Sequence, residues 1–431
     1  MTEMMLYLLR KCIKTKFLSV IAFLTGICIY LARRESHDEV NDFNHPIIIW
    51  WTPFLYEDKQ VICQNLFKCV VTKNRKFQHS AAAFLFYGSN FDKYDLPLPK
   101  NLTPWAIFHE ESPKNLALFL HRESQEIFNI TSTFSRNSDL PLTLQYLEDI
   151  NSITDVSYYR SLSEKNLLLN DISPILYIQS DCDTPIERDF FVSELMKYVK
   201  VDSYGKCLNN KELPKELTFE QTLENLYEPT FMKFVSRYKF VVAIENAVCD
   251  DYITEKLWRP LMVGSIPIYL GSPTVSDWLP HNRSAILVKD YESIVDLANF
   301  ITTLNTNDTM YEEYMAHKMS KKISNHRLKY AFQKGKFGIE HNEDFTVHAF
   351  ECFVCKSVYE NWKKRPSSIV YNCDKPKAGD PRRDNWWISH WRNGKCEAKT
   401  LQYFVQNLKT FNYTKDMFEN KSKEFLDSNE C

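Results

Sequence analysis

Residues 238–271 read YKFVVAIENAVCDDYITEKLWRPLMVGSIPIYLG, and this segment is the clearest structural signal in the chain. Tyr238–Ile244 is a short apolar run rich in aromatic and β-branched residues, which is typical of a buried strand. Ser265–Leu270 is a second apolar run, and Gly271 stops it. The residues between the two runs have a helical pattern. The segment therefore predicts one β-α-β unit.

The predicted helix has a start signal and an apolar face. Asp250 or Asp251 is a plausible N-cap residue. Apolar residues then recur at helical spacing, at Ile253, Leu257 and Leu261. Because Pro260 lacks the backbone N–H of a helical hydrogen bond, we expect the helix to bend or end early there.

The start of this helix predicts a binding site for a diphosphate. Ligands of open parallel sheets bind beyond the carboxyl ends of the strands, where helix N-termini point free N–H groups. Lys256 adds a full positive charge in the first turn. Glu245, Asn246 and Glu255 are available to hold hydroxyl groups. The alternative is an ordinary surface helix with an exposed Glu–Lys pair.

The wording ENAVCDDYITEKLWRP, within the wider pattern YKFxxAxEN…DYITEKLWRxL…PxxxG, closely resembles the donor-binding motif of the α1,3-fucosyltransferases, glycosyltransferase family 10. The resemblance implies a GT-B fold, with two Rossmann-like α/β domains facing across a cleft. It also implies GDP-fucose as donor, no metal or other cofactor, and inversion at the fucose anomeric carbon. Cys249 in the loop resembles the endoplasmic-reticulum subgroup that fucosylates Ser/Thr of small disulfide-bonded modules.

Length and charge agree with a two-domain globular protein. The chain has 431 residues, enough for two cores, and 44% of them are hydrophobic. The net charge of −2 gives no electrostatic case for binding nucleic acid or an anionic membrane surface. Only nine glycines are present, which argues against a glycine-rich nucleotide loop.

The N-terminus predicts a type II membrane anchor. Residues 17–32 are uncharged and mostly apolar, and four Lys or Arg residues lie within the preceding tail, residues 1–16. This charge distribution favours a cytosolic N-terminus. A cleaved signal peptide is the alternative, although Tyr30 is bulky for position −3 of a cleavage site. We expect residues 33–45 to form a stem and the remainder to face the lumen of the endoplasmic reticulum, or alternatively of the Golgi.

Cysteines and glycosylation sequons agree with a lumenal location. Ten of the twelve cysteines lie beyond Arg34, an even number that suits an oxidising compartment. Cys63 and Cys69 bracket a short segment and are close enough in sequence to pair. The candidate N-glycosylation sites are Asn101, Asn129, Asn282, Asn307, Asn412 and Asn420.

Alternating strands and helices divide the lumenal part into domains. The first domain, residues 46–165, carries apolar runs at Pro46–Leu55, Ala81–Tyr87, Trp105–Phe108 and Phe128–Phe134. The second domain, residues 166–345, contains Ile172–Ser180, Val201–Gly205 and the β-α-β unit, a doubly wound pattern. Residues 346–431 have a different texture, with several Cys and Trp residues, and we expect a C-terminal extension. No internal repeat is evident.

Glu111 is the candidate general base. It follows the Trp105–Phe108 strand, and Pro113 fixes the backbone just after it. The segment from Trp105 to Pro113 resembles the acceptor-side motif of the family, whose Glu is the proposed base. His109 and Glu110 are adjacent alternatives for the base. The alternative without catalysis is that these residues form an ordinary solvated acidic turn.

Family resemblance assigns further residues to the donor. Arg188, in the segment PIERDFF one turn into a predicted helix capped by Asp183 or Thr184, resembles the family's diphosphate-binding Arg. The alternative is an exposed Arg paired with Glu187 or Asp189. The segment FNITSTFSRNSDL places Arg136 near the donor, with Ser135 standing where many relatives carry another residue. The remaining donor residues implied are Asn246, Tyr252, Glu255 and Lys256, with Glu245 as their neighbour.

Two motifs offer metal alternatives. Asp181-Cys-Asp183 matches the D-x-D pattern with which another transferase class holds Mn²⁺, but it also fits a helix cap. Cys352-x-x-Cys355 fits a redox pair or half a zinc site, yet no second metal-binding pair completes it. Family members carry a comparable late pair that forms a disulfide, so the resemblance implies a Cys352–Cys355 bond.

The sequence therefore predicts an inverting, GDP-fucose-dependent fucosyltransferase with a glycoprotein acceptor. Protein Ser/Thr is the expected acceptor, and GlcNAc of N-glycans is the alternative. A non-catalytic lectin-like or chaperone protein is a further alternative.

Overall fold

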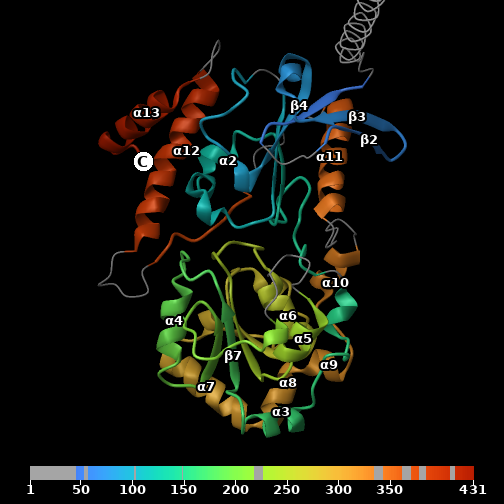
Figure 1. Ribbon diagram of the computed structural model, residues 1–431, viewed down its shortest axis with the longest axis vertical. Helices are drawn as coiled ribbons and strands as arrows, with labels where there is room; N and C mark the ends of the chain where they lie inside the picture. Colours follow the sequence, from blue (N-terminus) through green and yellow to red (C-terminus); the bar gives the residue numbers. More distant parts are fainter. Residues whose placement is uncertain are drawn as a thin grey trace, which may run out of the picture. The chain divides into compact units, whose positions relative to one another are not determined.

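The computed structural model describes residues 45–52, 57–100, 103–147, 149–217, 227–333, 343–361, 370–377, 385–407 and 413–431. Contacts divide the chain into two units, Met1–Pro46 and Ile47–Cys431, and the fold described here is that of the second unit. This unit contains two β-sheets, each built from a continuous part of the chain (Figure 1).

The first sheet has six strands in the order β2-β3-β1-β4-β5-β6. Its strands are β1 (Ile47–Trp50), β2 (Lys59–Cys63), β3 (Phe67–Thr72), β4 (Ala81–Tyr87), β5 (Trp105–His109) and β6 (Ile130–Thr133). All neighbours are parallel except β2 and β3, which form an antiparallel hairpin. The sequence did not predict this hairpin, because its turn uses Gln64 and Asn65 at positive φ instead of glycine.

The second sheet has five parallel strands in the order β11-β10-β9-β7-β8. They are β7 (Ile175–Gln179), β8 (Val201–Gly205), β9 (Phe240–Ile244), β10 (Ile266–Leu270) and β11 (Ile286–Leu287). Two separate apolar cores flank this sheet. One contains residues of α5 (Pro229–Val235) and α6 (Glu255–Val263), and the other contains residues of α4 (Arg188–Leu195) and α7 (Ile294–Thr306). Helices on both faces make this the doubly wound α/β arrangement that the sequence predicts.

The predicted β-α-β unit is confirmed as β9, α6 and β10. Two details of its helix were wrong. The N-cap is Thr254, not Asp250 or Asp251, and the Thr254 hydroxyl accepts from the Lys256 N–H. The helix also continues three residues past Pro260 and ends at Gly264, whose φ of 72° is the left-handed conformation of a helix C-cap.

The segment that connects the two sheets begins to pack against the second sheet at an earlier residue than the sequence predicts. Tyr146, Leu147 and Ile153 pack into the core beside α6. Leu162, at the start of α3 (Leu162–Leu168), packs into the opposite core. The boundary predicted at residue 165 therefore falls within residues that pack against the second sheet. The many polar residues of this segment gave no periodic apolar pattern from which the packing could be predicted.

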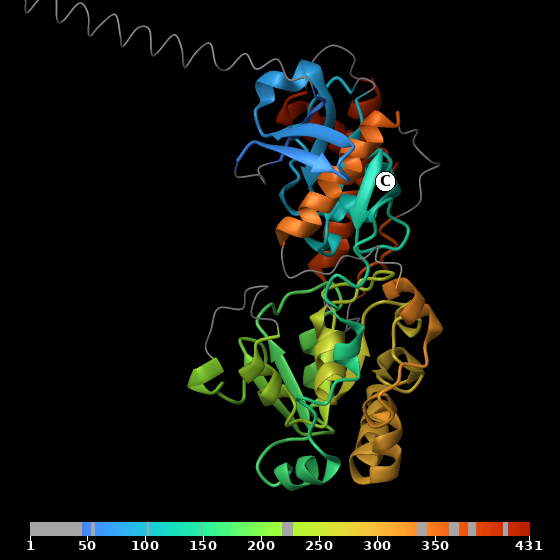
Figure 2. The same ribbon diagram turned by 90° about the vertical axis from the view of Figure 1, so that its right-hand side faces the viewer.

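The C-terminal residues are not a separate extension. Helix α11 (Glu343–Tyr359) returns to the first sheet, where Phe350 and Val354 join the core of Ile48 and Trp50. The Trp50 indole N–H donates to the Glu351 carboxylate at 2.9 Å inside this core. Figure 2 shows α11 lying along the β2–β3 hairpin. The core of the first sheet is therefore completed by α11, a helix that follows the second sheet in the sequence.

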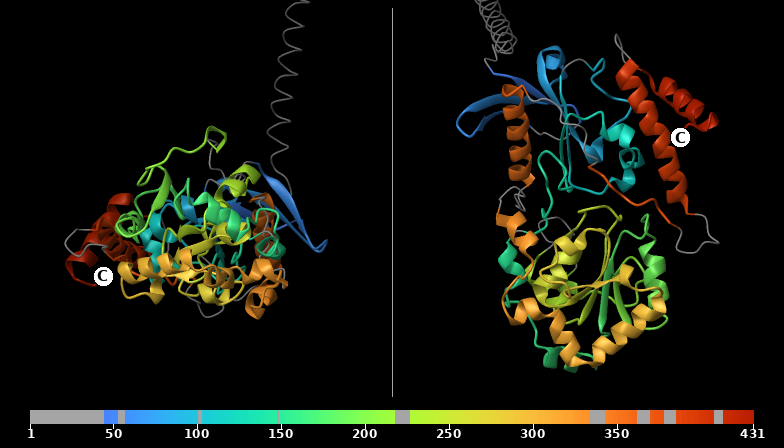
Figure 3. Two further views of the ribbon diagram at one scale, coloured as in Figure 1. Left: turned by 90° about the horizontal axis from the view of Figure 1, so that it is seen from below. Right: turned by 180° about the vertical axis from the view of Figure 1, so that it is seen from behind.

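We call the two parts of the chain built on the first and second sheets the first and second lobes. Helix α12 (Trp386–Asn407) packs against the first lobe and against α13 (Lys415–Asp427). Figure 3 shows α12 and α13 side by side. The contact with the 3-10 helix η4 (Ala117–Leu120) requires a glycine, because a Cβ at Gly394 would lie 2.5 Å from the Ala117 Cβ. This close approach fixes α12 beside the segment that follows Glu111.

Five disulfides use all ten cysteines beyond Arg34. The bonds are Cys63–Cys352, Cys69–Cys355, Cys182–Cys207, Cys249–Cys373 and Cys396–Cys431. Pairing of Cys63 with Cys69 and of Cys352 with Cys355 was therefore the wrong prediction. The four cysteines instead join α11 to the β2–β3 hairpin, a contact between segments almost 290 residues apart that local spacing could not reveal.

Within the described ranges, no helix is both long and apolar enough to cross a bilayer. The anchor predicted at residues 17–32, with the tail and most of the stem, lies outside those ranges.

Candidate functional site

Loop 245–254, between β9 and α6, is shaped by the buried carboxylate of Glu245. Both of its oxygens accept from Thr254, one from the backbone N–H at 2.9 Å and one from the hydroxyl at 2.7 Å. A Cβ at Gly271 would lie 2.5 Å from the Glu245 Cγ, so the glycine that ends β10 leaves room for this side chain. Glu245 thus orients the N-terminus of α6 rather than facing solvent.

Three charged groups determine the electrostatics of this helix end. Burial raises the pKa of Glu245 to about 7, against the opposing charge of Lys256. Burial acts to lower the pKa of Lys256, but Glu255 and Glu245 outweigh it and raise that pKa above its ordinary value. Burial likewise acts to raise the pKa of Glu255, but Lys256 and Arg259 outweigh it and lower that pKa. Lys256 and Glu255 are therefore both charged near neutral pH.

Arg188 is the first residue of α4, because the chain turns at Glu187 with a positive φ of 47°. Its fully buried guanidinium donates to the Asn246 side-chain oxygen at 2.7 Å and to the Asp181 backbone oxygen. The alternative of an exposed Arg188 paired with Glu187 or Asp189 is therefore excluded. The charge of Arg188 acts on Lys256, so the two cations share one electrostatic environment.

Glu111 lies just beyond the carboxyl end of β5 and reaches the loop of the second sheet. Its carboxylate accepts from the Tyr252 hydroxyl at 3.1 Å. Burial raises the pKa of Tyr252 well above its ordinary value, and the Glu111 charge adds to this effect, so the phenol stays protonated and donates. The predicted base and a predicted donor residue are thus in direct contact.

The two alternative bases are less suited to take a proton. Burial lowers the pKa of His109 to about 3, and its Nδ1 lies 2.8 Å from the Tyr371 hydroxyl. Such an imidazole cannot keep a proton near neutral pH. Glu110 accepts from the Tyr87 hydroxyl at 2.6 Å and is held in the first sheet.

A hollow of about 280 Å³, which we call the base pocket, brings residues of both sheets together. Its lining includes Glu111, Ser112 and Lys114 from the first sheet, and Asp181 and Asn246 from the second. Lys114 donates to Asp181 at 2.5 Å across this hollow. Asn246 also binds Arg188, so the base pocket holds the predicted base together with one residue that contacts a predicted diphosphate ligand.

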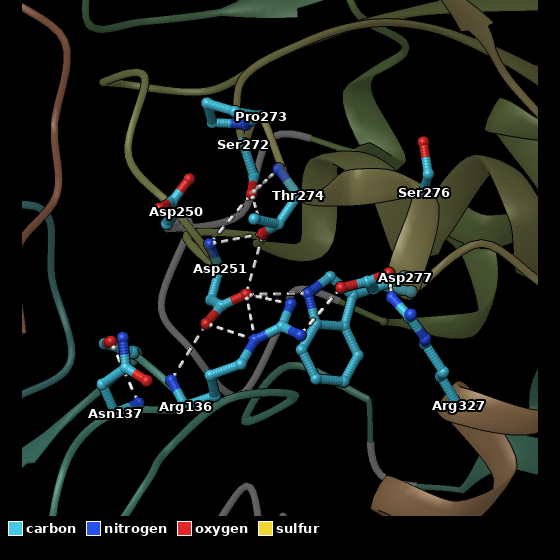
Figure 4. A network of polar contacts seen from close by, with 12 residues as sticks. Arg136, Asn137, Asp250, Asp251, Ser272, Pro273, Thr274, Ser276, Asp277 and Arg327 are labelled. Carbon is cyan, nitrogen blue, oxygen red and sulfur yellow. Dashed lines mark hydrogen bonds and ion pairs between the residues drawn. The ribbon is translucent and has the colours of Figure 1, made fainter.

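Arg136 does not have the free guanidinium expected of a donor ligand. It binds the Asp251 carboxylate through Nε at 2.9 Å and Nη2 at 2.5 Å, and it binds Asp277 through Nη1 at 2.7 Å (Figure 4). Its guanidinium also lies 4.5 Å from the centre of the Trp278 ring. The resemblance predicts that Arg136 lies near the donor, and the structure places it beside loop 245–254, which we call the donor loop because several predicted donor residues lie in it. The structure gives it a structural partner, the almost fully buried Asp251.

The Asp181-Cys-Asp183 motif is engaged by protein groups. Asp183 accepts from the indole N–H groups of Trp386 at 2.9 Å and Trp387 at 2.7 Å. Asp181 binds Lys114, and Cys182 is bonded to Cys207. The motif thus holds α12 and the base pocket in place. The Cys352-x-x-Cys355 motif is used in two disulfides, so neither a redox pair nor a zinc ligand set is present there.

Sequence reasoning missed the segment 370–374. Cys373 is bonded to Cys249, and the Asp250 N–H donates to the Asn372 carbonyl at 2.9 Å. The Asp374 N–H donates to the Val248 carbonyl at 2.8 Å, and an isolated antiparallel bridge pairs Cys373 with Cys249 of the donor loop. The signal in the sequence that could have revealed this segment was Cys249, for which no disulfide partner had been predicted. Lys114 was also missed, although it directly follows the Glu-Ser-Pro motif.

The predicted sequons fall into three groups. Asn282, Asn307 and Asn420 are exposed, and Asn129 is half-buried, with its side-chain oxygen accepting from the Trp105 N–H. Asn101 and Asn412 lie outside the described residues.

Comparison with known proteins gives consistent results along the chain. The family model described as "Glycosyltransferase family 10 (fucosyltransferase) C-term" matches residues 171–370. The family model described as "Fucosyltransferase, N-terminal" matches residues 43–145. The chain is 42% identical over 405 residues to GDP-fucose protein O-fucosyltransferase 3 of Canis lupus familiaris, covering 88% of this chain and 83% of the relative. It is 41% identical over 393 residues to the Homo sapiens protein of that name, covering 85% and 81%.

A solved structure, "Crystal Structure of alpha1,3-Fucosyltransferase with GDP", matches with a TM-score of 0.43 at 17% identity. The match covers 69% of this chain and 92% of that one.

Proposed function

The chain belongs to glycosyltransferase family 10, the fucosyltransferases, and from this premise we propose that it transfers L-fucose from GDP-fucose to a glycoprotein hydroxyl. One observation carries the proposal. The Glu111 carboxylate from the first sheet meets Tyr252 of the loop preceding α6, in a base pocket that Asn246 also lines. A proton acceptor is thus next to the residues expected to hold the donor.

The donor diphosphate is bound by positive charge without a metal ion. Lys256 carries its charge in the first turn of α6, and Arg188 adds its charge through the contact with Asn246. Glu255 holds a hydroxyl of the nucleoside, and Tyr252 borders the fucose. As the bond to fucose breaks, these fixed groups stabilise the negative charge that develops on GDP.

Glu111 acts as the general base. The acceptor hydroxyl loses its proton to the Glu111 carboxylate while its oxygen attacks the anomeric carbon from the side opposite GDP, so the configuration inverts. Tyr252 donates to the same carboxylate and fixes its orientation. Glu245 is a positioning residue, since it binds Thr254 rather than a reacting group.

The acceptor is a protein hydroxyl, on Ser or Thr of a small disulfide-bonded module. The relatives at about 41% identity are named GDP-fucose protein O-fucosyltransferase 3, and they match most of the chain. Transfer to GlcNAc of N-glycans is the second candidate acceptor reaction. A lectin-like or chaperone protein without activity is the third candidate, against which the intact set of Glu111, Arg188 and Lys256 argues.

The location follows the predicted anchor. We place the chain in the endoplasmic-reticulum membrane as a single-pass type II protein, with the Golgi as alternative. The use of ten cysteines in five disulfides supports an oxidising lumen for the catalytic unit.

A donor and acceptor screen tests the function. The full-length chain, purified in detergent, is incubated with several nucleotide sugars and with either a panel of folded disulfide-bonded modules or free N-glycans. We expect fucose transfer from GDP-fucose to a folded module, with equal rates in the presence of EDTA. Transfer to N-glycans alone would favour the second candidate, and loss of activity in EDTA would revive a metal mechanism.

A further inference from the structure

A second hollow of about 400 Å³ adjoins the base pocket, and we call it the α12 hollow. Its lining includes Val248, Leu270 and Pro273 on the second sheet, and Trp387 and Trp391 on α12. Lys114 lines both this hollow and the base pocket, and it lies three residues after Glu111. A molecule whose hydroxyl reaches Glu111 can therefore extend directly into the α12 hollow.

The residues assigned to the donor do not line this hollow. Among its described lining residues there is no Arg188, Tyr252, Glu255 or Lys256. Its volume lies within the range of small-ligand pockets, roughly 300–1,000 Å³. The hollow is thus available for a part of the acceptor while GDP-fucose is bound.

The chemistry of the lining suits a polypeptide better than an oligosaccharide. The described lining residues are mostly apolar or aromatic, and Asp374 is the one among them with a planar amide, guanidinium or carboxylate group, the groups that bind sugar hydroxyls in pairs. His390 of α12 also lines the hollow, and its buried Nε2 has no hydrogen-bond partner in the described part of the chain. An apolar side chain with a neighbouring backbone amide would satisfy both features.

The rim of the hollow is positively charged. Lys289, Lys375 and Lys377 are exposed there, and Asp374 is the one carboxylate among the described lining residues. Lys375 lies 5.0 Å above the Trp391 ring, which places a cation directly beside an apolar wall. Such a combination fits an apolar residue flanked by Asp or Glu.

The hollow is also built to be rigid. The Trp387 indole is held by Asp183 at 2.7 Å, and the segment that carries the lysines is tied to the donor loop by the Cys249–Cys373 bond. Rigid walls lower the ordering cost of binding.

We propose that the α12 hollow binds a polypeptide segment of the acceptor next to the fucosylated residue, through an apolar side chain flanked by carboxylates. This inference depends on the protein-acceptor function proposed above, and it adds which surface selects the acceptor and by what chemistry.

Steady-state kinetics of Trp391→Ala and of the double variant Lys375→Glu/Lys377→Glu test the proposal. The acceptor probe is the folded module that the wild-type chain fucosylates fastest, and GDP affinity is measured in parallel. We expect the KM for the module to rise roughly tenfold or more in each variant, with GDP affinity unchanged. The matched controls are Tyr403→Ala, an aromatic residue of α12 outside the hollow, and Lys423→Glu on α13, and both should retain the wild-type KM.

Each other result overturns the inference in a distinct way. An unchanged KM in the charge-reversed variant, whose exposed positions do not endanger folding, would show that the hollow does not select the acceptor. Weaker GDP binding would assign the hollow to the donor. An equal KM increase for a free N-glycan acceptor would make it a glycan site. If the wild-type chain fucosylates no module at all, the protein-acceptor function fails first.

Discussion

At the scale of single residues, the site depends on buried charges that compensate one another. Glu245, Glu255, Lys256 and Arg188 lie around the start of α6, and each modifies the ionisation of a neighbour. Removing one of them leaves another charge without its partner in a region of low dielectric constant. Substitutions here therefore report on both donor binding and local stability, and the two effects need separate measurements.

Lys256→Met removes the cation assigned to the diphosphate. Charge-assisted contacts to phosphate contribute about 1.5–3 kcal/mol each, so we expect GDP to bind roughly ten- to hundredfold more weakly. Calorimetric titration with GDP measures this change, and the exposed Lys206→Met on the same lobe is the control. Equal GDP affinity in Lys256→Met and wild type would remove Lys256 from the donor site.

Glu245→Gln should alter the pH dependence of stability. The pKa of Glu245 rises from 4.5 in its ordinary state to about 7 in the fold, so between these values the native chain keeps a proton that the unfolded chain has lost. The wild-type free energy of unfolding therefore falls as pH rises through this window, by on the order of 3 kcal/mol. The variant lacks this loss, so its stability relative to wild type should increase from pH 4.5 to 7 and then level off.

Urea unfolding at a series of pH values measures the difference. The exposed Glu216→Gln should give a difference that does not vary with pH. A flat difference for Glu245→Gln as well would mean that Glu245 ionises normally in the folded protein.

Local motifs led to two of the residue-level predictions. Glu111 and Tyr252 were both identified by sequence segments, and the structure brings them to 3.1 Å. Arg136 shows the limit, because its motif predicted a position near the donor and not that Asp251 and Asp277 bind its guanidinium. A partner that lies more than 100 residues away has no local signature.

At the scale of elements, the fold depends on segments near the C-terminus that complete the core of the N-terminal sheet. The alternation of strands and helices predicted both parallel sheets, because the period of the apolar residues is a local property. The β2–β3 hairpin and the return of α11 were not predicted, since neither the turn at Gln64 nor the packing of Phe350 follows a period. Two disulfides now link these two unpredicted elements.

Removing those disulfides should have strongly non-additive effects. Either bond alone closes a loop of almost 290 residues, but with one in place the other closes only a short extra loop. Chain entropy then gives a loss of about 2–3 kcal/mol for one pair replaced by Ala and at least twice that for both pairs. Scanning calorimetry of Cys63→Ala/Cys352→Ala, Cys69→Ala/Cys355→Ala and the quadruple variant measures this. If one pair alone cost as much as both, the second bond would contribute nothing.

At the scale of the whole catalytic unit, the two sheets are connected through the site itself. Glu111 with Tyr252, Lys114 with Asp181, and Arg136 with Asp251 all join a residue after a first-sheet strand to a residue after a second-sheet strand. These contacts come from the carboxyl ends of parallel strands, which is where α/β folds place their ligands. The contacts that build the proposed site therefore also hold the two sheets together.

Arg136→Ala should destabilise the unit more than its partial exposure suggests. Asp251 is almost fully buried, and in Arg136→Ala its carboxylate keeps the contacts with Thr274, Trp278 and the backbone N–H of residue 136 but loses every charged partner in the described part of the chain. We expect a loss of about 2 kcal/mol, discounted for the exposure of the guanidinium, and little recovery in Arg136→Lys, which lacks the two-pronged geometry. Thermal unfolding measures both, with the exposed Arg283→Ala as control. Full recovery in Arg136→Lys would show that charge alone is sufficient.

The rate of fucose transfer by Glu111→Gln, from GDP-fucose to the folded module in the presence of EDTA, tests the proposed mechanism most directly. The amide keeps the size of the carboxylate and can still accept from Tyr252, but it cannot take a proton. We expect the wild-type chain to work in EDTA and the variant to lose roughly 10²–10⁴-fold in kcat while binding GDP normally. A variant that transfers fucose at the wild-type rate would contradict the assignment of Glu111 as the base and, with it, the proposed site.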